Sequence, residues 1–410
     1  MEELFAKRIK RMENGELAEI MSLVGRDDII SFAGGIPADE IFPFEKLSRL
    51  IEQLLREKGA SVFQYASTGG NKLLKDYIIA FLKERNIPAQ RKNILITTGS
   101  QQALDLLSKI FIDPGDKVFV EKPGYVGGIG AIQSYEAELI GIEMDKNGIK
   151  IDILEQELKR LTDKGDRAKF IYLVPDFSNP SGARLSLERR KRVLELARNY
   201  DFYIIEDTPY SELYYYNEPL PFLKEMEQNY RKQDRRVIFM GSFSKFFIPG
   251  MRIGWICADQ KLIELLGRAK QNTDLASNNF GQQLISLAGE EGLIDKQLER
   301  VKPYYRQKLE LMTGAMEQYM PDKVIWNTPQ GGFFFWLELP EDIESRELLD
   351  MAVKEGVAFV TGNSFFPKFE DGDHYARVSF CNVPEEQIEE GIRKLAEIIQ
   401  MYENSTGRPC

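Results

Sequence analysis

Seven short, apolar and β-branched segments run through the middle of this 410-residue chain. Each is too short for a helix and mostly apolar on both faces, the pattern of strands buried on both sides of a sheet. Amphipathic helical segments fit between them, for example at 101–111 and 186–200. The pattern predicts a three-layer α/β domain with a mostly parallel seven-stranded sheet. The strand segments are 94–98, 117–121, 137–143, 169–174, 202–206, 237–241 and 253–257.

The pattern of apolar and amphipathic segments changes after residue 299. An amphipathic helix, three short apolar strands and a closing helix follow, which predicts a smaller α+β unit. The first 50 residues hold one expected helix near 17–24 and an extended stretch around 32–37. We therefore predict an N-terminal segment (1–49) that packs on the small domain and the substrate site, a large domain (50–299) and a small C-terminal domain (300–410).

Composition excludes several classes of function. Lysine and arginine total 54 against 64 acidic residues, a net charge of −10, which argues against general nucleic-acid binding. No apolar run reaches the roughly 18 residues that a membrane span needs, and the N-terminus lacks the apolar core of a secretory signal, so we expect a cytoplasmic protein. Cys257, Cys381 and Cys410 are too few and too scattered for a disulfide framework or a zinc site. His374 is the only histidine, so we expect a different group to move protons and no metal centre.

The segment 241–255, GSFSKFFIPGMRIGW, carries the most chemistry. Lys245 follows a buried strand, and apolar surroundings lower the pKa of a lysine, whose neutral amine can then attack an aldehyde to form a Schiff base. Ser242, Ser244 and Arg252 supply the hydroxyls and the guanidinium that a phosphate group needs. The plain alternative is a strand end with a surface lysine and a structural arginine, but the whole string favours the functional interpretation.

The pattern Ser-x-Ser-Lys-x-x-x-Pro-Gly-x-Arg-x-Gly resembles the signature of the class I/II aminotransferases, which are fold-type I enzymes that use pyridoxal 5′-phosphate (PLP). Matching pieces run from about residue 32 to about residue 380. The resemblance implies that PLP is the cofactor and that Lys245 both forms the Schiff base with it and moves the substrate's proton. An L-amino acid and a 2-oxo acid would be the substrates.

The same resemblance assigns residues to the phosphate of the cofactor. Ser100 and Gln101, with Gln102, stand at a predicted strand-to-helix junction, where free N–H groups and the helix dipole favour an anion. A plain helix cap is the alternative. Tyr65 matches the tyrosine that reaches the phosphate of the other subunit in dimers of the family. The resemblance therefore implies a homodimer with shared active sites.

Four residues are assigned to the cofactor ring by resemblance. Tyr125 would stack on the ring, and Asn179, in an Asn-Pro-Ser-Gly loop, would donate to the phenolic oxygen O3′. Asp207 would pair with the pyridinium nitrogen and keep it protonated, and Tyr210 would reach O3′. The alternatives are a core tyrosine for Tyr125, an ordinary turn for the loop of Asn179 and a helix cap for Asp207.

Substrate contacts come from three positions by resemblance. Arg377 would grip the α-carboxylate in a bidentate fork, while Gly35 and Asn179 would lie against the substrate. An exposed strand arginine and a simple Gly-rich turn are the alternatives for Arg377 and Gly35.

The stretch 30–37, ISFAGGIP, is typical of the 2-aminoadipate/kynurenine branch, whose members often have broad specificity and accept 2-oxoglutarate. Some members hold a second carboxylate with an arginine from the N-terminal helix. The corresponding stretch 17–20, LAEI, has no cation, which favours aromatic or aliphatic donors, although glutamate or 2-aminoadipate could still enter. Pyruvate is the other expected acceptor.

Two other functions share these motifs. A β-lyase, a racemase or a carbon–carbon bond-forming enzyme uses the same fold and the same cofactor contacts. A transcription regulator can fuse the fold to a DNA-binding domain. That would need a winged-helix segment ahead of residue 1, whereas the expected fold begins almost at once and the charge is negative.

Overall fold

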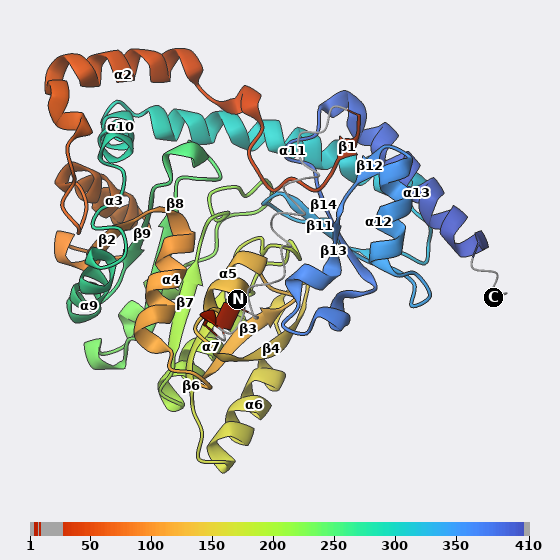
Figure 1. Cartoon of the computed structure of the whole chain (residues 1–410), viewed down its shortest axis with the longest axis horizontal. Coiled ribbons are helices and arrows are strands. Elements are labelled where there is room, and N and C mark those ends of the chain that lie inside the picture. The colour runs from red at the N-terminus through yellow and green to blue at the C-terminus, as the bar shows by residue number, and fades with distance from the viewer. Residues whose placement is uncertain (1–3, 7, 10–27, 406–410) are drawn as a thin grey trace.

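A computed structural model describes residues 4–6, 8–9 and 28–405. The expected helix near 17–24 and Cys410 lie outside the described residues. The chain forms a large α/β body and a smaller α+β region beside it (Figure 1). The predicted α/β fold is confirmed.

An eight-stranded sheet forms the centre of the large body, in the order β2-β9-β8-β7-β6-β3-β4-β5. Seven strands match the predicted segments within about two residues at each end, and the eighth, β5, is a short addition that pairs antiparallel with β4. β9 runs antiparallel to both of its neighbours, and the remaining pairs are parallel. The strands are β2 (Ile94–Thr97), β3 (Lys117–Lys122), β4 (Glu138–Asp145), β5 (Gly148–Ile149), β6 (Ala168–Leu173), β7 (Tyr203–Asp207), β8 (Val237–Ser242) and β9 (Gly254–Cys257).

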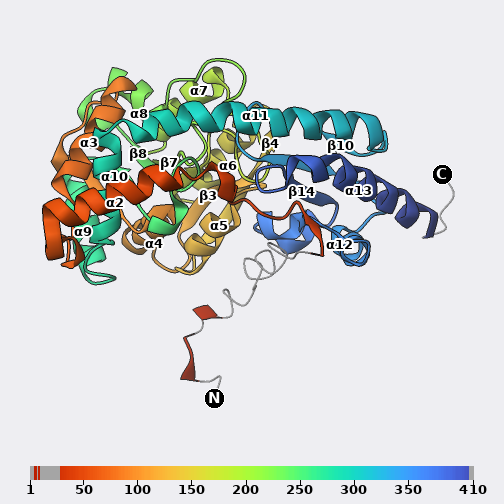
Figure 2. The same cartoon turned by 90° about the horizontal axis from the view of Figure 1, so that it is seen from above.

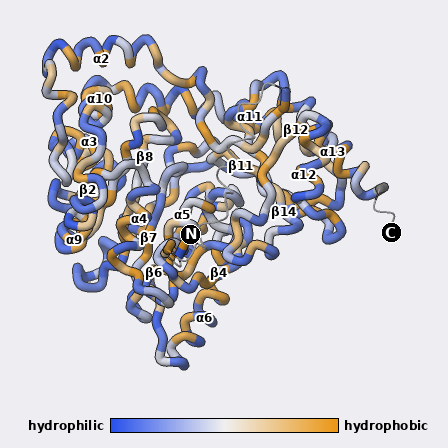
Figure 3. The backbone as a smooth tube through the Cα atoms, viewed as in Figure 1, coloured by the Kyte–Doolittle hydropathy of each residue, from blue (hydrophilic) through white to orange (hydrophobic). Residues whose placement is uncertain are grey.

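Side chains alternate between the two faces of this sheet, as the strand period of two requires. On β3, Val118 and Val120 join the core cluster that contains α4, whereas Phe119 joins the cluster that contains α6 and α7. Figure 3 shows the hydrophobic positions gathered along the strands of the sheet. The helices of the large body are α2 (Phe44–Lys58), α3 (Lys72–Glu84), α4 (Gly99–Phe111), α5 (Val126–Gln133), α6 (Ile151–Asp163), α7 (Leu187–Asn199), α8 (Leu223–Met226), α9 (Gln260–Gln271) and α10 (Asn279–Glu290).

The smaller region holds a four-stranded antiparallel sheet in the order β10-β11-β14-β13. Helix α11 connects it to the large body and runs along both parts (Figure 2). The expected domain boundary at 299/300 falls within this unbroken helix. The elements are α11 (Leu293–Tyr319), β10 (Ile325–Trp326), β11 (Phe334–Glu338), α12 (Ser345–Lys354), β12 (Val357–Ala358), β13 (Val360–Thr361), β14 (Tyr375–Ser379) and α13 (Glu385–Ser405).

Residues 32–42 form a connection that we call the strap, which is irregular except for the short 3-10 helix η3 (Asp39–Ile41). At one end, β1 (Ile30–Ser31) pairs in parallel with β12 of the smaller region. At the other end, the strap leads into α2 of the large body, as the red and orange trace of Figure 1 shows. The strap thus joins the two parts of the molecule. None of the helices described is long and apolar enough to cross a membrane.

Candidate functional site

A cavity of about 120 Å³ lies where β7 and β8 end and α4 begins. This is the edge of the sheet at which the carboxyl ends of parallel strands place ligand-binding loops. The cavity collects most of the residues that the sequence singled out. They are Ser100, Gln101, Tyr125, Asn179, Asp207, Tyr210, Ser242, Ser244, Lys245 and Arg252, together with Tyr172, Val174 and Pro209.

A larger cleft of about 1330 Å³ opens elsewhere, beside residues such as Lys122, Arg184 and Trp336. None of the predicted cofactor or substrate residues lines it. We therefore assign the chemistry to the smaller cavity, where the reactive groups converge.

Lys245 lies just after β8 and is partly buried in the cavity wall. Its Nζ donates a hydrogen bond of 2.8 Å to the main-chain oxygen of Gly35 and lies 5.8 Å from the centre of the Tyr210 ring. Burial lowers the pKa of Lys245 to about 8. A larger fraction of the amine is therefore neutral and nucleophilic at neutral pH than in an ordinary lysine.

Asp207, at the end of β7, is 2% exposed, and only one of its two carboxylate oxygens has a hydrogen-bond partner among the described residues. The Tyr172 hydroxyl donates to its Oδ2 at 2.9 Å, while the buried Oδ1 makes no hydrogen bond. Burial raises the pKa of Asp207 to about 7, against the opposing effect of the Tyr172 hydrogen bond. A buried carboxylate with a free oxygen favours a ligand that brings a proton or a positive charge.

Hydroxyls and a guanidinium also line the cavity, near the start of α4 and just after β8. Ser242 Oγ donates to Ser244 Oγ at 2.9 Å, and Arg252 Nη1 lies 3.5 Å from Ser244 Oγ. The buried Ser100 Oγ has no partner of good hydrogen-bond geometry among the described residues, although its hydroxyl is near enough to Asp207 to oppose the rise in the pKa of that carboxyl. At Gly99, φ is +76° and a Cβ atom would lie 2.6 Å from Arg252 Nη2, so glycine is required there. These donors surround a place for an anion at the start of α4.

Gln101 and Gln102 face different ways. Gln101 lines the cavity, and its Nε2 donates to the Gly127 main-chain oxygen. The Gln102 side chain lies outside the cavity lining, and its Oε1 accepts from the Thr98 N–H and from Lys270. Adjacent helical residues point about 100° apart, so both side chains cannot face one ligand. The Gln102 side chain is therefore engaged away from the cavity, and the expected phosphate contact of Gln102 stays a prediction that only its main-chain N–H can meet.

Arg377, on β14, is 3% exposed and has no carboxylate partner among the described residues. Its Nη1 donates to Asn179 Oδ1 at 2.9 Å and its Nη2 to the Ala33 main-chain oxygen at 2.6 Å, while the buried Nε makes no hydrogen bond. The guanidinium carbon lies 4.4 Å from the centre of the Phe334 ring, and burial lowers the pKa of Arg377 to about 10. A buried cation without an acid partner favours an anionic ligand.

The strap brings Gly35 to this cavity. A Cβ atom at Gly35 would lie 2.9 Å from Phe334 Cζ, so a larger residue would have to displace that ring. The main-chain oxygens of Ala33 and Gly35 accept hydrogen bonds from Arg377 and Lys245. Cys381 Sγ lies 3.1 Å from the Ile36 oxygen and 3.4 Å from the Gly34 oxygen, so its one proton can be donated to either. The backbone next to Lys245 is therefore held by side chains on both sides of Gly35.

Two further sequence predictions receive no support from the cavity lining. Tyr65 is 81% exposed and does not line the cavity of its own chain. The stretch 17–20, expected to cover the substrate side chain, lies outside the described residues. Conversely, sequence reasoning missed Tyr172. It stands in a segment interpreted only as a buried strand, and a lone tyrosine in an apolar strand was the available signal.

The cavity fits the cofactor that the resemblance implies. The orphaned Ser100 hydroxyl and the Arg252 guanidinium suit a phosphate group, and the free oxygen of Asp207 suits a protonated ring nitrogen. The Lys245 amine belongs to the lining of the same cavity. Elsewhere in the described part of the chain, no cluster of three or more His, Cys, Asp or Glu side chains is suited to hold a metal ion.

Comparisons with known proteins point in the same direction. The family model described as aminotransferase class I and II matches residues 27–395. The chain is 41% identical over 400 residues to aromatic-amino-acid aminotransferase 1 of Thermococcus litoralis, covering 97% of this chain and 94% of that protein.

Two solved structures are similar over nearly the whole chain. The kynurenine aminotransferase of Pyrococcus horikoshii, in complex with PMP, KYN and KYA, has a TM-score of 0.92 and 38% identity and covers 98% of both chains. The α-aminoadipate aminotransferase LysN of Thermus thermophilus, in complex with N-(5′-phosphopyridoxyl)-L-leucine, has a TM-score of 0.90 and 34% identity and covers 98% of this chain and 99% of that one.

Proposed function

The chain belongs to the aminotransferase class I and II family, and on that premise we propose that it transfers the amino group of L-amino acids with broad side-chain specificity to a 2-oxo acid such as 2-oxoglutarate or pyruvate. It is a PLP-dependent aminotransferase. The observation that carries the substrate proposal is the buried Arg377 guanidinium, which lacks an acid partner beside the catalytic lysine.

When bound, PLP accepts the amino group and withdraws electrons from the substrate Cα. Ser100, Ser242, Ser244 and Arg252 would hold its phosphate, with the N–H groups of the first turn of α4. Asp207 would hold a proton at the pyridine nitrogen. Tyr125 would stack on the ring, and Asn179 and Tyr210 would bind O3′.

Lys245 supplies the proton chemistry. Its amine has a pKa lowered to about 8, so it releases and takes up a proton near neutral pH. The Gly35 main-chain oxygen orients that amine at 2.8 Å. We assign to Lys245 Nζ the removal of the proton from the Cα atom of a bound amino acid. No histidine is required for this step.

Arg377 would bind the α-carboxylate that every amino-acid substrate carries. Its contacts with Asn179 and the Ala33 oxygen fix the guanidinium before substrate arrives, which reduces the entropy lost on binding. Because this contact is common to all substrates, it gives no choice between side chains. Broad side-chain specificity is further supported by the relatives, whose names include aromatic amino acids, kynurenine and α-aminoadipate.

A screen of amino donors against pyruvate and 2-oxoglutarate tests this function. We expect turnover with aromatic and aliphatic donors, and conversion of the PLP absorbance to that of pyridoxamine phosphate in equal amount when a donor is added alone. Ammonia or a racemised amino acid without pyridoxamine phosphate would instead identify a lyase or a racemase.

We also propose a homodimer in which Tyr65 reaches the phosphate of the partner's cofactor. Its exposure supports this, as does the exposure of Phe63 (72%) and Phe44 (78%), since large exposed apolar side chains mark interaction surfaces. We further propose the cytoplasm as the place of action, which the free, buried thiols of Cys257 and Cys381 support. The three-part division at 49/50 and 299/300 stays a proposal.

A further inference from the structure

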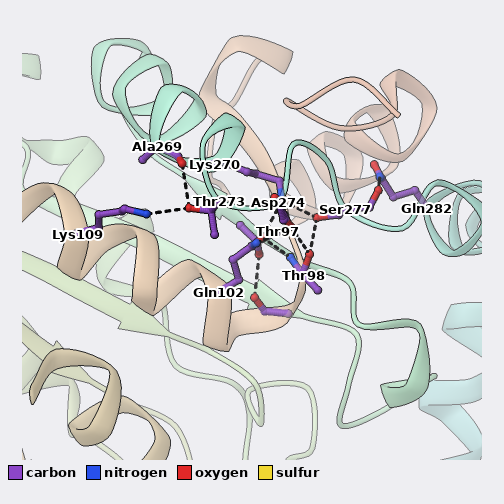
Figure 4. A network of polar contacts seen from close by, with 11 residues as sticks. Thr97, Thr98, Gln102, Lys109, Ala269, Lys270, Thr273, Asp274, Ser277 and Gln282 are labelled. Atoms are coloured by element: carbon purple, nitrogen blue, oxygen red, sulfur yellow. Dashed lines mark hydrogen bonds and ion pairs between the residues drawn. The ribbon is translucent and has the colours of Figure 1, made fainter. Parts of the chain in front are cut away.

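A network of polar side chains joins the start of α4 to the residues that follow α9 (Figure 4). None of the residues labelled there lines the cavity. Lys270, near the end of α9, stands at the centre of the network with 0% exposure. Its Nζ donates to Gln102 Oε1 at 2.7 Å, to both oxygens of Asp274 at 2.8 and 2.9 Å, and to Ser277 Oγ at 2.9 Å. Lysine is rarely buried completely, so this arrangement calls for a reason.

The network ends on the backbone of the anion-binding turn. Gln102 Oε1, which accepts from Lys270, also accepts from the Thr98 N–H at 2.8 Å. The Thr98 hydroxyl in turn lies 3.0 Å from Asp274 Oδ2 and 3.0 Å from Ser277 Oγ. Both ends of the segment 98–102 are thereby fixed, and Ser100 and Gln101 lie between them.

Helix α4 has no side-chain cap of its own. Thr98 occupies the N-cap position, but its hydroxyl bonds to Asp274 and Ser277 and accepts from no N–H of the first turn. A helix N-terminus that must present free N–H groups to an anion cannot use those groups in a cap. The turn is therefore fixed through the Thr98 N–H and the Gln102 side chain.

The charge of Lys270 is neutralised locally. The Asp274 carboxylate pairs with it, and the pKa of Asp274 is lowered, chiefly by its hydrogen bonds to Lys270 and Gln102 against the effect of burial. Lys270 thus acts through directed hydrogen bonds, since its ion pair leaves little net charge to attract a phosphate over a distance.

The same network holds the neighbouring loop. Gln282 Nε2 donates to the Ser277 main-chain oxygen, and Gln282 Oε1 accepts from the Asn71 N–H, so the connection reaches the loop that follows Tyr65. The Lys270 amine therefore joins the start of α4 to the residues after α9, and the Gln282 side chain extends the connection to the start of α3.

We propose that Lys270 is a positioning residue for the phosphate end of the cofactor cavity, acting through Gln102 and Thr98 on the turn that carries Ser100 and Gln101. The inference rests on the proposed binding of PLP in this cavity. It predicts a defect that depends on the phosphate group of the ligand.

The test compares PLP with pyridoxal, which lacks the phosphate but still reacts with Lys245. Dissociation constants of both are measured on the cofactor-free full chain. In Lys270→Met we expect the preference for PLP over pyridoxal to fall on the order of tenfold, the effect of about one lost hydrogen bond. Gln102→Met removes the link to Thr98 and should lower the preference in the same direction.

Lys224→Met is the matched control. Lys224 is a largely buried lysine that pairs with Glu227 three residues on, and it contacts the main-chain oxygen of Val237, at the opposite end of β8 from the cavity. We expect Lys224→Met to prefer PLP over pyridoxal by the same ratio of dissociation constants as the wild type. Equal losses for PLP and pyridoxal in Lys270→Met, or an unchanged ratio in both Lys270→Met and Gln102→Met, overturn the proposal. If Lys270→Met does not fold, the Gln102→Met ratio decides. Wild-type protein that binds neither ligand contradicts the proposed function instead.

Discussion

Lys245 Nζ and the main-chain oxygen of Gly35 are 2.8 Å apart, although 210 residues separate them in the sequence. The amine therefore has a fixed acceptor that comes from the strap and not from its own strand. This contact fixes the position of the amine in the lining of the cavity, and it leads directly to the first two predictions.

Replacing the amine should abolish turnover while leaving a binding site. In Lys245→Ala we expect kcat to fall about a thousandfold or more, because the general base is lost. PLP should still bind, through the contacts at its phosphate and ring. Borohydride reduction of the wild type should attach the cofactor to Lys245, which peptide mass spectrometry detects. A label on another lysine contradicts the assignment.

The Cys381 thiol should prove necessary for the position of the strap. Its Sγ lies 3.1 Å from the Ile36 oxygen and 3.4 Å from the Gly34 oxygen, and burial raises the pKa of this thiol, so it remains a protonated donor. In Cys381→Ala we expect faster amide exchange in residues 33–38 and a kcat reduced about threefold to tenfold, as for one lost hydrogen bond. Cys381→Ser should recover much of this loss.

Cys257→Ala provides the control for that experiment. Cys257 is equally buried, at 2% exposure, and lies on β9 without a contact to the strap. We expect both alanine variants to lose a similar free energy of unfolding, about 1 kcal/mol. Only Cys381→Ala should change the rate of amide hydrogen exchange in residues 33–38 of the strap. Identical exchange in both variants would refute a positioning role for the thiol.

Asp207 should leave a signature in the pH dependence of stability. Burial raises its pKa from 3.8 to about 7 in the folded, cofactor-free protein, so the folded state binds more protons than the unfolded state between those values. Its stabilising contribution is present at low pH and is lost as the pH rises through 7. The melting temperature of Asp207→Asn should therefore fall less steeply than that of the wild type between pH 5 and 7.5.

The comparison with the variant is essential, because Glu121 and Glu206 also have pKa values raised by burial, to about 8 and about 7, and titrate in both proteins. Asp207→Asn should in addition bind PLP about 10- to 100-fold more weakly, since a charged hydrogen bond is lost. Parallel melting curves in the two proteins would exclude the titration of Asp207 in this range.

Arg377→Ala should impair every amino donor alike. The lost bidentate contact should cost about 3 kcal/mol or more, which lowers kcat/KM about a hundredfold or more. The measurement is kcat/KM for one aromatic, one aliphatic and one acidic donor. A loss confined to one donor class would assign Arg377 to the side chain and not to the α-carboxylate.

Mixed dimers test the shared site. Tyr65→Phe and Lys245→Ala chains, each impaired alone, form a heterodimer that holds both defects in one site and leaves the other intact. At equal mixing we expect about a quarter of wild-type activity per chain, because half the dimers are mixed and each has one intact site of two. No recovery from two folded, dimeric variants contradicts a cross-subunit role for Tyr65.

The sequence was sufficient for those parts of the site that depend on local spacing. The apolar pattern predicted where the strands of Asp207 and Ser242 end, and the motifs with their family resemblance assigned both residues to one site; the structure shows that these two strands are adjacent and parallel. The direction of Gln102 did not follow, because it depends on Lys270, which is 168 residues away. The partnership of Tyr172 with Asp207 and the contacts of the strap also join distant segments, and no spacing within one segment encodes them.

The strap is tied at both ends, to β12 in the smaller region and to α2 in the large body, and its backbone meets Arg377 and Lys245 on the way. Bond lengths and peptide planes limit how far a chain segment can lengthen, so a displacement at one end of the strap is transmitted to its other residues. If the smaller region shifts when a carboxylate binds Arg377, the strap shifts with it. The Gly35 main-chain oxygen, which accepts the hydrogen bond from Lys245 Nζ, then changes position. Substrate binding at Arg377 and the position of the Lys245 amine would then be linked through the eleven residues of the strap.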